Sequence, residues 1–89
     1  MRVTKIRRTQ EIYPHNIEER FTIVIDDLFE IRKVRLYKNS KGEYRLDYPS
    51  EHIEKSNREV TIVHPIDDSL NKYLTKSVVD AMEAATWTN

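Results

Sequence analysis

The stretch that decides the fold is EVTIVHPIDD, residues 59–68. Its β-branched run, Val60–Val63, is stiff at χ1 and suits the pleated surface of a strand. Pro65 lacks a backbone donor and favours extended backbone at the residue before it, so we expect the strand to end at His64. The stretch therefore predicts a strand that ends where the chain changes to another kind of structure.

A helix is predicted to follow, from about Asp68 to Ala85. Asp67 or Asp68 can accept hydrogen bonds from the free N–H groups of a helix start, and its negative charge suits that end of the helix dipole. Apolar residues then recur at helical spacing, at Leu70, Tyr73, Leu74, Val78, Ala81, Met82 and Ala85. The rest of the chain must supply the sheet that this helix covers.

Four further strands are predicted upstream, at Val3–Arg8, Phe21–Ile25, Leu28–Lys38 and Tyr44–Tyr48. The basic first strand is typical of an exposed sheet edge. Gln10–Glu19, which contains Tyr13-Pro14-His15-Asn16, is either a long connection or a lengthened hairpin. Ser50–Arg58 is predicted to be a polar loop.

The third of these strands contains a change of phase. Phe29 and Ile31 share one parity, whereas Val34 and Leu36 share the other. A period of two residues cannot bury both pairs on one face, so we expect a β-bulge near Arg32-Lys33. The alternative is a strand with apolar contacts on both faces.

Turn residues separate the predicted strands. Asp26-Asp27 is expected to form a tight turn, since aspartate tolerates unusual backbone angles. Gly42, the only glycine in the sequence, is expected to supply a positive φ in the next turn.

Length and composition are those of one small domain, which we expect to span residues 1–89. The predicted elements give an α+β fold, a small antiparallel sheet of about five strands with one C-terminal helix packed on it. No apolar run approaches the ~20 residues that span a bilayer, and the N-terminus lacks the apolar segment of a signal peptide. The absence of cysteine excludes disulfides and fits a cytoplasmic protein.

The net charge of zero hides a division along the chain. Residues 1–45 hold eleven Lys and Arg against seven Asp and Glu, a balance of +4. Residues 46–89 hold four against eight, a balance of −4. Such asymmetry can form a basic face, or the charges can be scattered over a solvated surface.

The densest cations are the candidates for a phosphate-binding surface. They are Arg32, Lys33, Arg35, Lys38 and Arg45 on the central hairpin, with Lys72 and Lys76 on the helix. For the two helix lysines, ion pairs with Asp68 and Asp80 on a solvated face are an equally open account.

No residue pattern predicts catalysis, a metal or a cofactor. His15, His52 and His64 lie far apart in sequence, without a second ligand at metal spacing. The adjacent Ser50-Glu51-His52 rarely converges as a catalytic site needs, and a single glycine excludes a glycine-rich phosphate loop. His64 is expected to cap the strand end or to bond a neighbouring carbonyl through its ring.

Four short motifs occur in a familiar order, Val34-Arg35-Leu36, Gly42-Glu43-Tyr44, Tyr48-Pro49-Ser50 and His64-Pro65-Ile66. With this order and spacing, the sequence resembles the SpoVG family, the bacterial stage V sporulation protein G or septation-protein family. Val3–Arg8 also looks like the family's opening strand, and the likeness covers roughly residues 2–85. The chain departs from the family at Tyr48, where methionine is usual, in a longer connection from Gln10 to Arg20, and in lacking the acidic tail of many members.

The resemblance implies a homodimer that binds DNA and, in some members, RNA, with a regulatory role in gene expression, septation and cell division, or sporulation. It implies neither an enzyme nor a small-molecule substrate, nor a membrane partner. A homodimer also has a physical reason, because one helix covers one sheet face and leaves edges and a face open. The alternative is a non-enzymatic protein-interaction module that pairs an exposed sheet edge with a partner strand, which the zero net charge favours.

Overall fold

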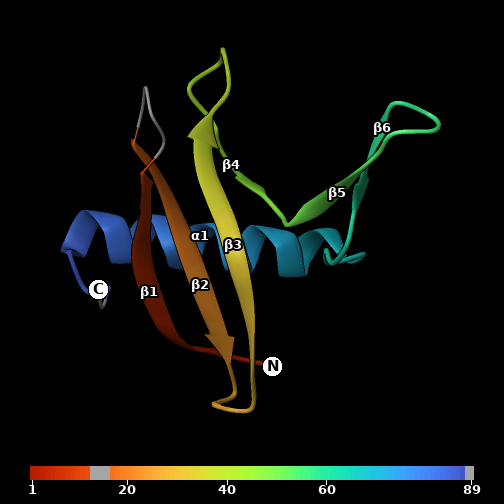
Figure 1. The fold of residues 1–89 in the computed structure, drawn as a ribbon. Coiled ribbons are helices and arrows are strands. Elements are labelled where there is room, and N and C mark those ends of the chain that lie inside the picture. The colour runs from red at the N-terminus through yellow and green to blue at the C-terminus, as the bar shows by residue number, and fades with distance from the viewer. Residues whose placement is uncertain (13–16, 88–89) are drawn as a thin grey trace.

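Alternating apolar residues in the first half of the chain build one antiparallel sheet, which a C-terminal helix covers on one face (Figure 1). The computed structural model describes residues 1–12 and 17–87. The sheet has four strands in the order β1-β2-β3-β4, with the bounds β1 Val3–Ile12, β2 Ile17–Ile25, β3 Phe29–Lys38 and β4 Tyr44–Asp47. Strands β5 (Ser50–Ile53) and β6 (Arg58–Thr61) form a separate two-stranded sheet, and helix α1 is Asp68–Ala84. The predicted α+β class is confirmed.

The first hairpin is longer than the predicted strands. β1 pairs with β2 as far as Ile12 and Ile17, so the lengthened hairpin is the correct reading of Gln10–Glu19. Tyr13-Pro14-His15-Asn16 lies outside the described residues. β1 stands at one edge of the sheet, as its basic composition predicts.

The segment Ser50–Arg58, predicted to be a polar loop, instead contains β5 and the start of β6, and that prediction was wrong. The two strands pair with each other from Ser50–Thr61 to Ile53–Arg58 and project from the sheet as an arm (Figure 1). The fifth predicted strand therefore lies in this arm rather than in the main sheet, and it ends at Thr61 rather than His64. Polar pairs such as His52–Glu59 stabilise the arm, and such pairs leave no apolar alternation in the sequence.

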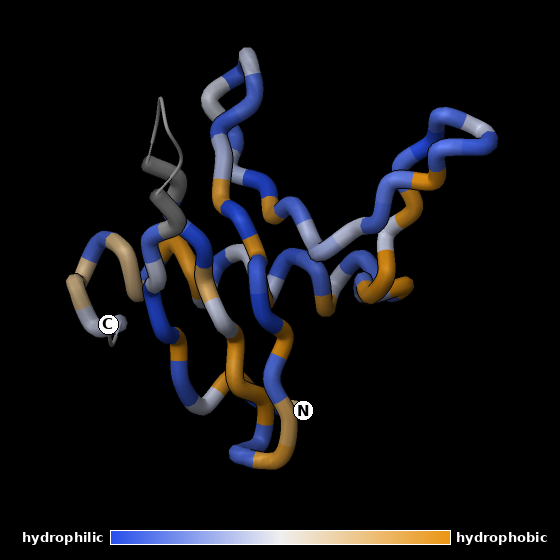
Figure 2. The backbone as a smooth tube through the Cα atoms, in the orientation of Figure 1, coloured by the Kyte–Doolittle hydropathy of each residue, from blue (hydrophilic) through white to orange (hydrophobic). Residues whose placement is uncertain are grey.

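The predicted bulge in β3 is present. Phe21 pairs with Val34, and Ile23 pairs with Ile31. One residue of β2 thus lies opposite two residues of β3, so β3 carries one extra residue. Lys33 adopts the positive φ, 60°, of a bulge residue. Because the phase is reset, both Ile31 and Val34 face the core, and hydrophobic and hydrophilic residues alternate along β3 (Figure 2).

Helix α1 begins and ends as its sequence predicts. Asp67 is the N-cap, and its Oδ1 accepts a hydrogen bond of 2.9 Å from the Ser69 N–H. A hydrogen bond from the Ser69 hydroxyl, together with the one from its N–H, lowers the pKa of Asp67. Ala85 closes the helix in the left-handed conformation with φ 53°.

The core lies between the helix and the sheet. Leu74, Val78 and Ala81 of α1 are buried against Ile6, Phe21, Ile23, Ile25, Val34 and Leu46 of the strands. Trp87 packs back onto this core, with its ring edge-to-face to Phe21 at 6.3 Å and 4.6 Å from the Arg8 guanidinium. The predicted helix stripe is therefore the face that docks on the sheet.

Both predicted turns are confirmed. Asp26 and Asp27 have φ values of 54° and 53°, the signature of a tight hairpin turn between β2 and β3. Gly42 has a φ of 81° in the turn between β3 and β4.

We predict that Lys33→Gly raises the free energy of unfolding by about 0.5–1 kcal/mol, because glycine adopts a positive φ without the steric cost of a Cβ. Urea unfolding measures the change. The matched control is Lys38→Gly on the same strand, where φ is not positive and glycine should lower stability by about 0.5–1 kcal/mol. Shifts of the same sign at the two positions would contradict a strained Lys33.

Candidate functional site

The face of the sheet opposite α1 is uncovered (Figure 1). We call it the outer face. The register places on it the cations Lys5, Arg7, Arg20, Arg32, Lys33, Arg35 and Arg45. The carboxylates that β3 and β4 contribute to the same face are Glu30 and Asp47. A protein of zero net charge thus has a face on which cations outnumber carboxylates.

The bulge concentrates charge on the outer face. Two consecutive residues of β3 oppose one residue of β2 at this point, so Arg32 and Lys33 both project away from the core. The Arg32 Nε lies 2.6 Å from Glu30 Oε1, and Arg7 reaches the same carboxylate from β1. The hydrogen bond from Arg32 is the main reason that the pKa of Glu30 lies below its ordinary value. Glu30 stays ionised and holds two arginines side by side.

A groove of about 380 Å³ lies where the outer face meets the arm. We call it the outer groove. Arg20, Lys33 and Arg35 line it from β2 and β3, and Tyr48, Pro49, Ser50 and Ile62 line it beside the arm. Asp47 lies in the same groove and pairs with Arg35 at 2.8 Å. Lys33 has no ion pair with any described residue, which leaves its charge available to a ligand.

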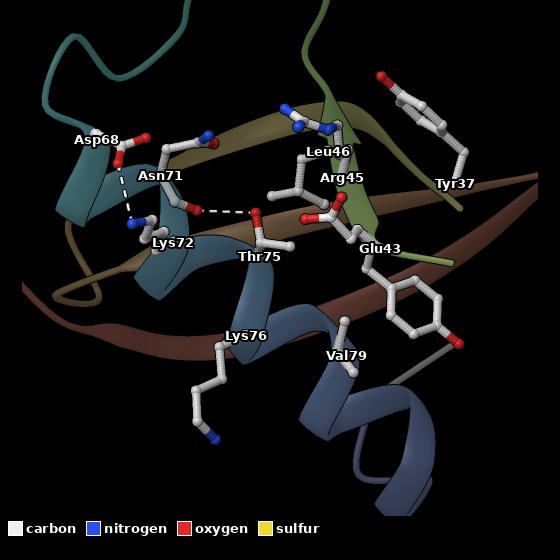
Figure 3. Close-up of a pocket in the computed structure, with 11 residues that line it drawn as sticks. Tyr37, Glu43, Arg45, Leu46, Asp68, Asn71, Lys72, Thr75, Lys76 and Val79 are labelled. Carbon is white, nitrogen blue, oxygen red and sulfur yellow. Dashed lines mark hydrogen bonds and ion pairs between the residues drawn. The ribbon is translucent and has the colours of Figure 1, made fainter. Parts of the chain in front are cut away.

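A second groove, of about 480 Å³, runs between the free edge of β4 and α1 (Figure 3). We call it the edge groove. Arg45, Lys72 and Lys76 all line it, so the structure brings together one hairpin cation and both helix lysines. Lys72 lies 3.2 Å from Asp68, and Lys76 lies 2.8 Å from Asp80. The bond to Asp80 raises the pKa of Lys76. The predicted i,i+4 ion pairs are confirmed, and phosphate contact by these lysines stays a prediction.

The candidate residues therefore divide between two places. Arg32, Lys33 and Arg35 belong to the outer face, whereas Lys38 lies with its Nζ 4.9 Å from the ring centre of Tyr44, its cross-strand partner. Sequence reasoning missed Arg7 and Arg20 because it selected cations by density along the chain. The parity of β2 contained the signal, since Arg20 and Thr22 alternate with the core residues Phe21 and Ile23.

The histidines within the described residues have local partners. His52 Nδ1 lies 3.1 Å from Glu59 Oε1 across the arm. His64 Nδ1 lies 3.2 Å from the Pro65 carbonyl oxygen, so the predicted bond from the ring to a neighbouring carbonyl is confirmed. His15 lies outside the described residues. No helix within residues 1–12 and 17–87 is long and apolar enough to cross a membrane.

Comparison with known families identifies the family to which the chain belongs. The family model SpoVG matches residues 1–84 of the 89-residue chain. The chain belongs to the SpoVG family. Membership suggests a regulatory protein related to sporulation or septation. No curated protein and no solved structure gave a match to the chain.

One tyrosine, Tyr48, joins the two layers of the fold. Tyr48 donates a hydrogen bond of 2.7 Å to Asn71 Oδ1 on α1, and the same residue lines the outer groove. Burial raises the pKa of Tyr48 to about 12. The phenol is therefore held in its neutral form, in which it can donate this bond.

We predict that Tyr48 makes the free energy of unfolding of this SpoVG protein decrease as the pH rises through the alkaline range. The folded pKa of Tyr48 is about 12, against an ordinary value of 10.0, so the unfolded chain loses this proton first. The contribution of Tyr48 to stability is fully present below pH 10.0 and is lost as the pH rises toward about 12.

In Tyr48→Phe the midpoint of urea unfolding should decrease less between pH 10.0 and about 12 than it does in the original protein. Tyr37→Phe, at an exposed tyrosine, is the control and should leave the fall unchanged. Equal slopes for Tyr48→Phe and the original protein would contradict the assignment.

Proposed function

We propose that this SpoVG protein binds nucleic acid, DNA and RNA, through the outer face of its sheet, and that it acts without catalysis as a cytoplasmic regulator of gene expression, septation or sporulation. One observation carries the proposal, the basic face that α1 leaves uncovered, with Arg20, Lys33 and Arg35 around one groove. Lys and Arg side chains on an open surface are the groups that contact phosphates.

The outer face supports this function better than the helix does. Each helix lysine is already paired with an aspartate, and Glu83 adds a further negative charge to α1. Lys33 has no such pair among the described residues, and the groove beside it can admit a phosphate. The proposal therefore places Arg32 and Lys33, the cations at the bulge, before the helix lysines Lys72 and Lys76.

We predict that Lys33→Gln weakens binding to nucleic acid and flattens its salt dependence. One lost phosphate contact should lower the slope of log affinity against log salt by about 0.9 on duplex DNA and about 0.7 on a single strand. Titration of labelled oligonucleotides at several salt concentrations measures the slope. The matched control is Lys55→Gln in the turn of the arm, where a lysine is also exposed. Identical slopes for Lys33→Gln and the original protein would exclude this surface.

We also propose that the protein is a homodimer. Ile62, Val63 and Ile66 follow the arm and are 66%, 42% and 96% exposed, an apolar segment that burial against a second copy would stabilise. Sedimentation at tens of micromolar protein is expected to give the dimer mass, and Ile66→Asp is expected to shift it toward monomer. Leu28→Asp, at an apolar residue that is 84% exposed in the turn between β2 and β3, should leave the dimer intact. A monomer throughout would contradict the proposal.

The second candidate function is a protein-interaction module. The free edge of β4 beside the edge groove favours it, because unpaired backbone groups can add a partner strand. Strand pairing does not require the steep weakening with salt that phosphate binding does, so the same titrations distinguish the two functions.

A further inference from the structure

Tyr37 is an exposed aromatic side chain within the basic outer face. It lies two residues after Arg35 on β3, so both side chains project from the same face, about 7 Å apart by the strand rise. Its cross-strand partner is Arg45 on β4. The Tyr37 side chain is 44% exposed. Tyr37 and Arg45 also line the edge groove, so this aromatic ring stands beside two arginines where the outer face meets that groove.

Tyr37 has no internal role in the part of the chain that the structure describes. Its hydroxyl makes no hydrogen bond and its ring makes no aromatic or cation contact with a described residue. The other tyrosines of residues 17–87 differ, since Tyr44 packs with Lys38, Tyr48 bonds Asn71 and Tyr73 accepts a bond from the Val3 N–H. Single exposed apolar residues are common on protein surfaces, so exposure alone is not evidence that Tyr37 binds a ligand. The neighbouring arginines are the reason to infer a binding role for Tyr37.

We propose that the nucleic acid bound by the outer face is single-stranded and that a base stacks on Tyr37. This inference rests on the proposed function. Every base has a flat face that an aromatic ring can cover. Beside the ring, Arg35 is paired with Asp47, whereas Arg45 has no ion pair with a described residue and is placed for a flanking phosphate. In a duplex these base faces are already stacked on one another, so a duplex offers Tyr37 no equivalent contact.

The shape of the surface favours a strand over a duplex for a separate reason. The outer face is an open four-stranded sheet, a surface on which unpaired bases can spread. Reading of duplex DNA commonly inserts a helix into the major groove. Here α1 is packed against the opposite face, and its lysines are paired with Asp68 and Asp80. The position of α1 and the pairing of its lysines therefore do not suit insertion into the major groove of duplex DNA.

The ring of Tyr37 can be removed without disturbing the core. Tyr37→Ala and Tyr37→Leu both delete the aromatic face, and the leucine keeps an apolar side chain on the strand. Tyr37→Phe retains the ring and removes the hydroxyl. The probes are a uridine RNA oligomer, a thymidine DNA oligomer and a duplex of mixed sequence, at one fixed salt concentration.

Tyr37→Ala and Tyr37→Leu are expected to weaken binding to at least one of the single-stranded oligomers about 10-fold, which corresponds to about 1.4 kcal/mol. Tyr37→Phe should bind like the original protein. The salt slope should stay the same in all three variants, since no phosphate contact is lost. Duplex binding should be weaker than single-strand binding and insensitive to residue 37.

Three results would overturn the inference. Single-strand affinity that is unchanged in Tyr37→Ala, while Lys33→Gln loses affinity, removes base stacking and leaves the proposed function standing. An equal loss on the duplex removes the preference for a single strand. If the original protein binds none of the probes at low salt, the proposed function and this inference fail together.

Discussion

The extra residue in β3 is the constraint on which the sheet depends. Without it, Val34 and Leu36 would face the solvent and Arg35 would face the helix. The bulge avoids this burial of charge by accepting the positive φ of Lys33. The core and the outer face are therefore two consequences of one local distortion, since the residue that corrects the phase is also a cation on the open side.

Helix α1 then decides which face of the sheet can meet a ligand. Leu74, Val78 and Ala81 cover one side of the sheet, and apolar burial of this kind is the main favourable term in a domain of this size. The other side needs no apolar residues, so it can carry charge without loss of packing. Segregation by face explains how a neutral chain has a basic surface, because the acidic residues of the second half lie mainly in the arm and the helix.

The features that could be predicted from the sequence are those that depend on near neighbours. The helix cap at Asp67, the turn at Asp26-Asp27 and the bulge follow from a few adjacent residues, and each was found in the expected place. The arm was missed because its strands pair through polar residues such as Ser50 and Glu59, which give no apolar alternation.

The candidate surface was predicted less completely than the fold. Arg32, Lys33 and Arg35 are neighbours in sequence, so density along the chain was enough to select them. Arg7 and Arg20 join them through pairing between strands, which no local pattern specifies. Lys38 was selected by density as well, although it lies against Tyr44.

The position of α1 at the end of the described chain has a consequence for synthesis. The four strands leave the ribosome before α1, and each can pair with its predecessor as it emerges. Their apolar face, with Ile23 and Val34 at its centre, stays open until the segment around Leu74 and Val78 has been translated. The nascent sheet is thus exposed on both faces for much of its translation, a period in which chaperones can bind its apolar side and premature termination leaves an aggregation-prone product.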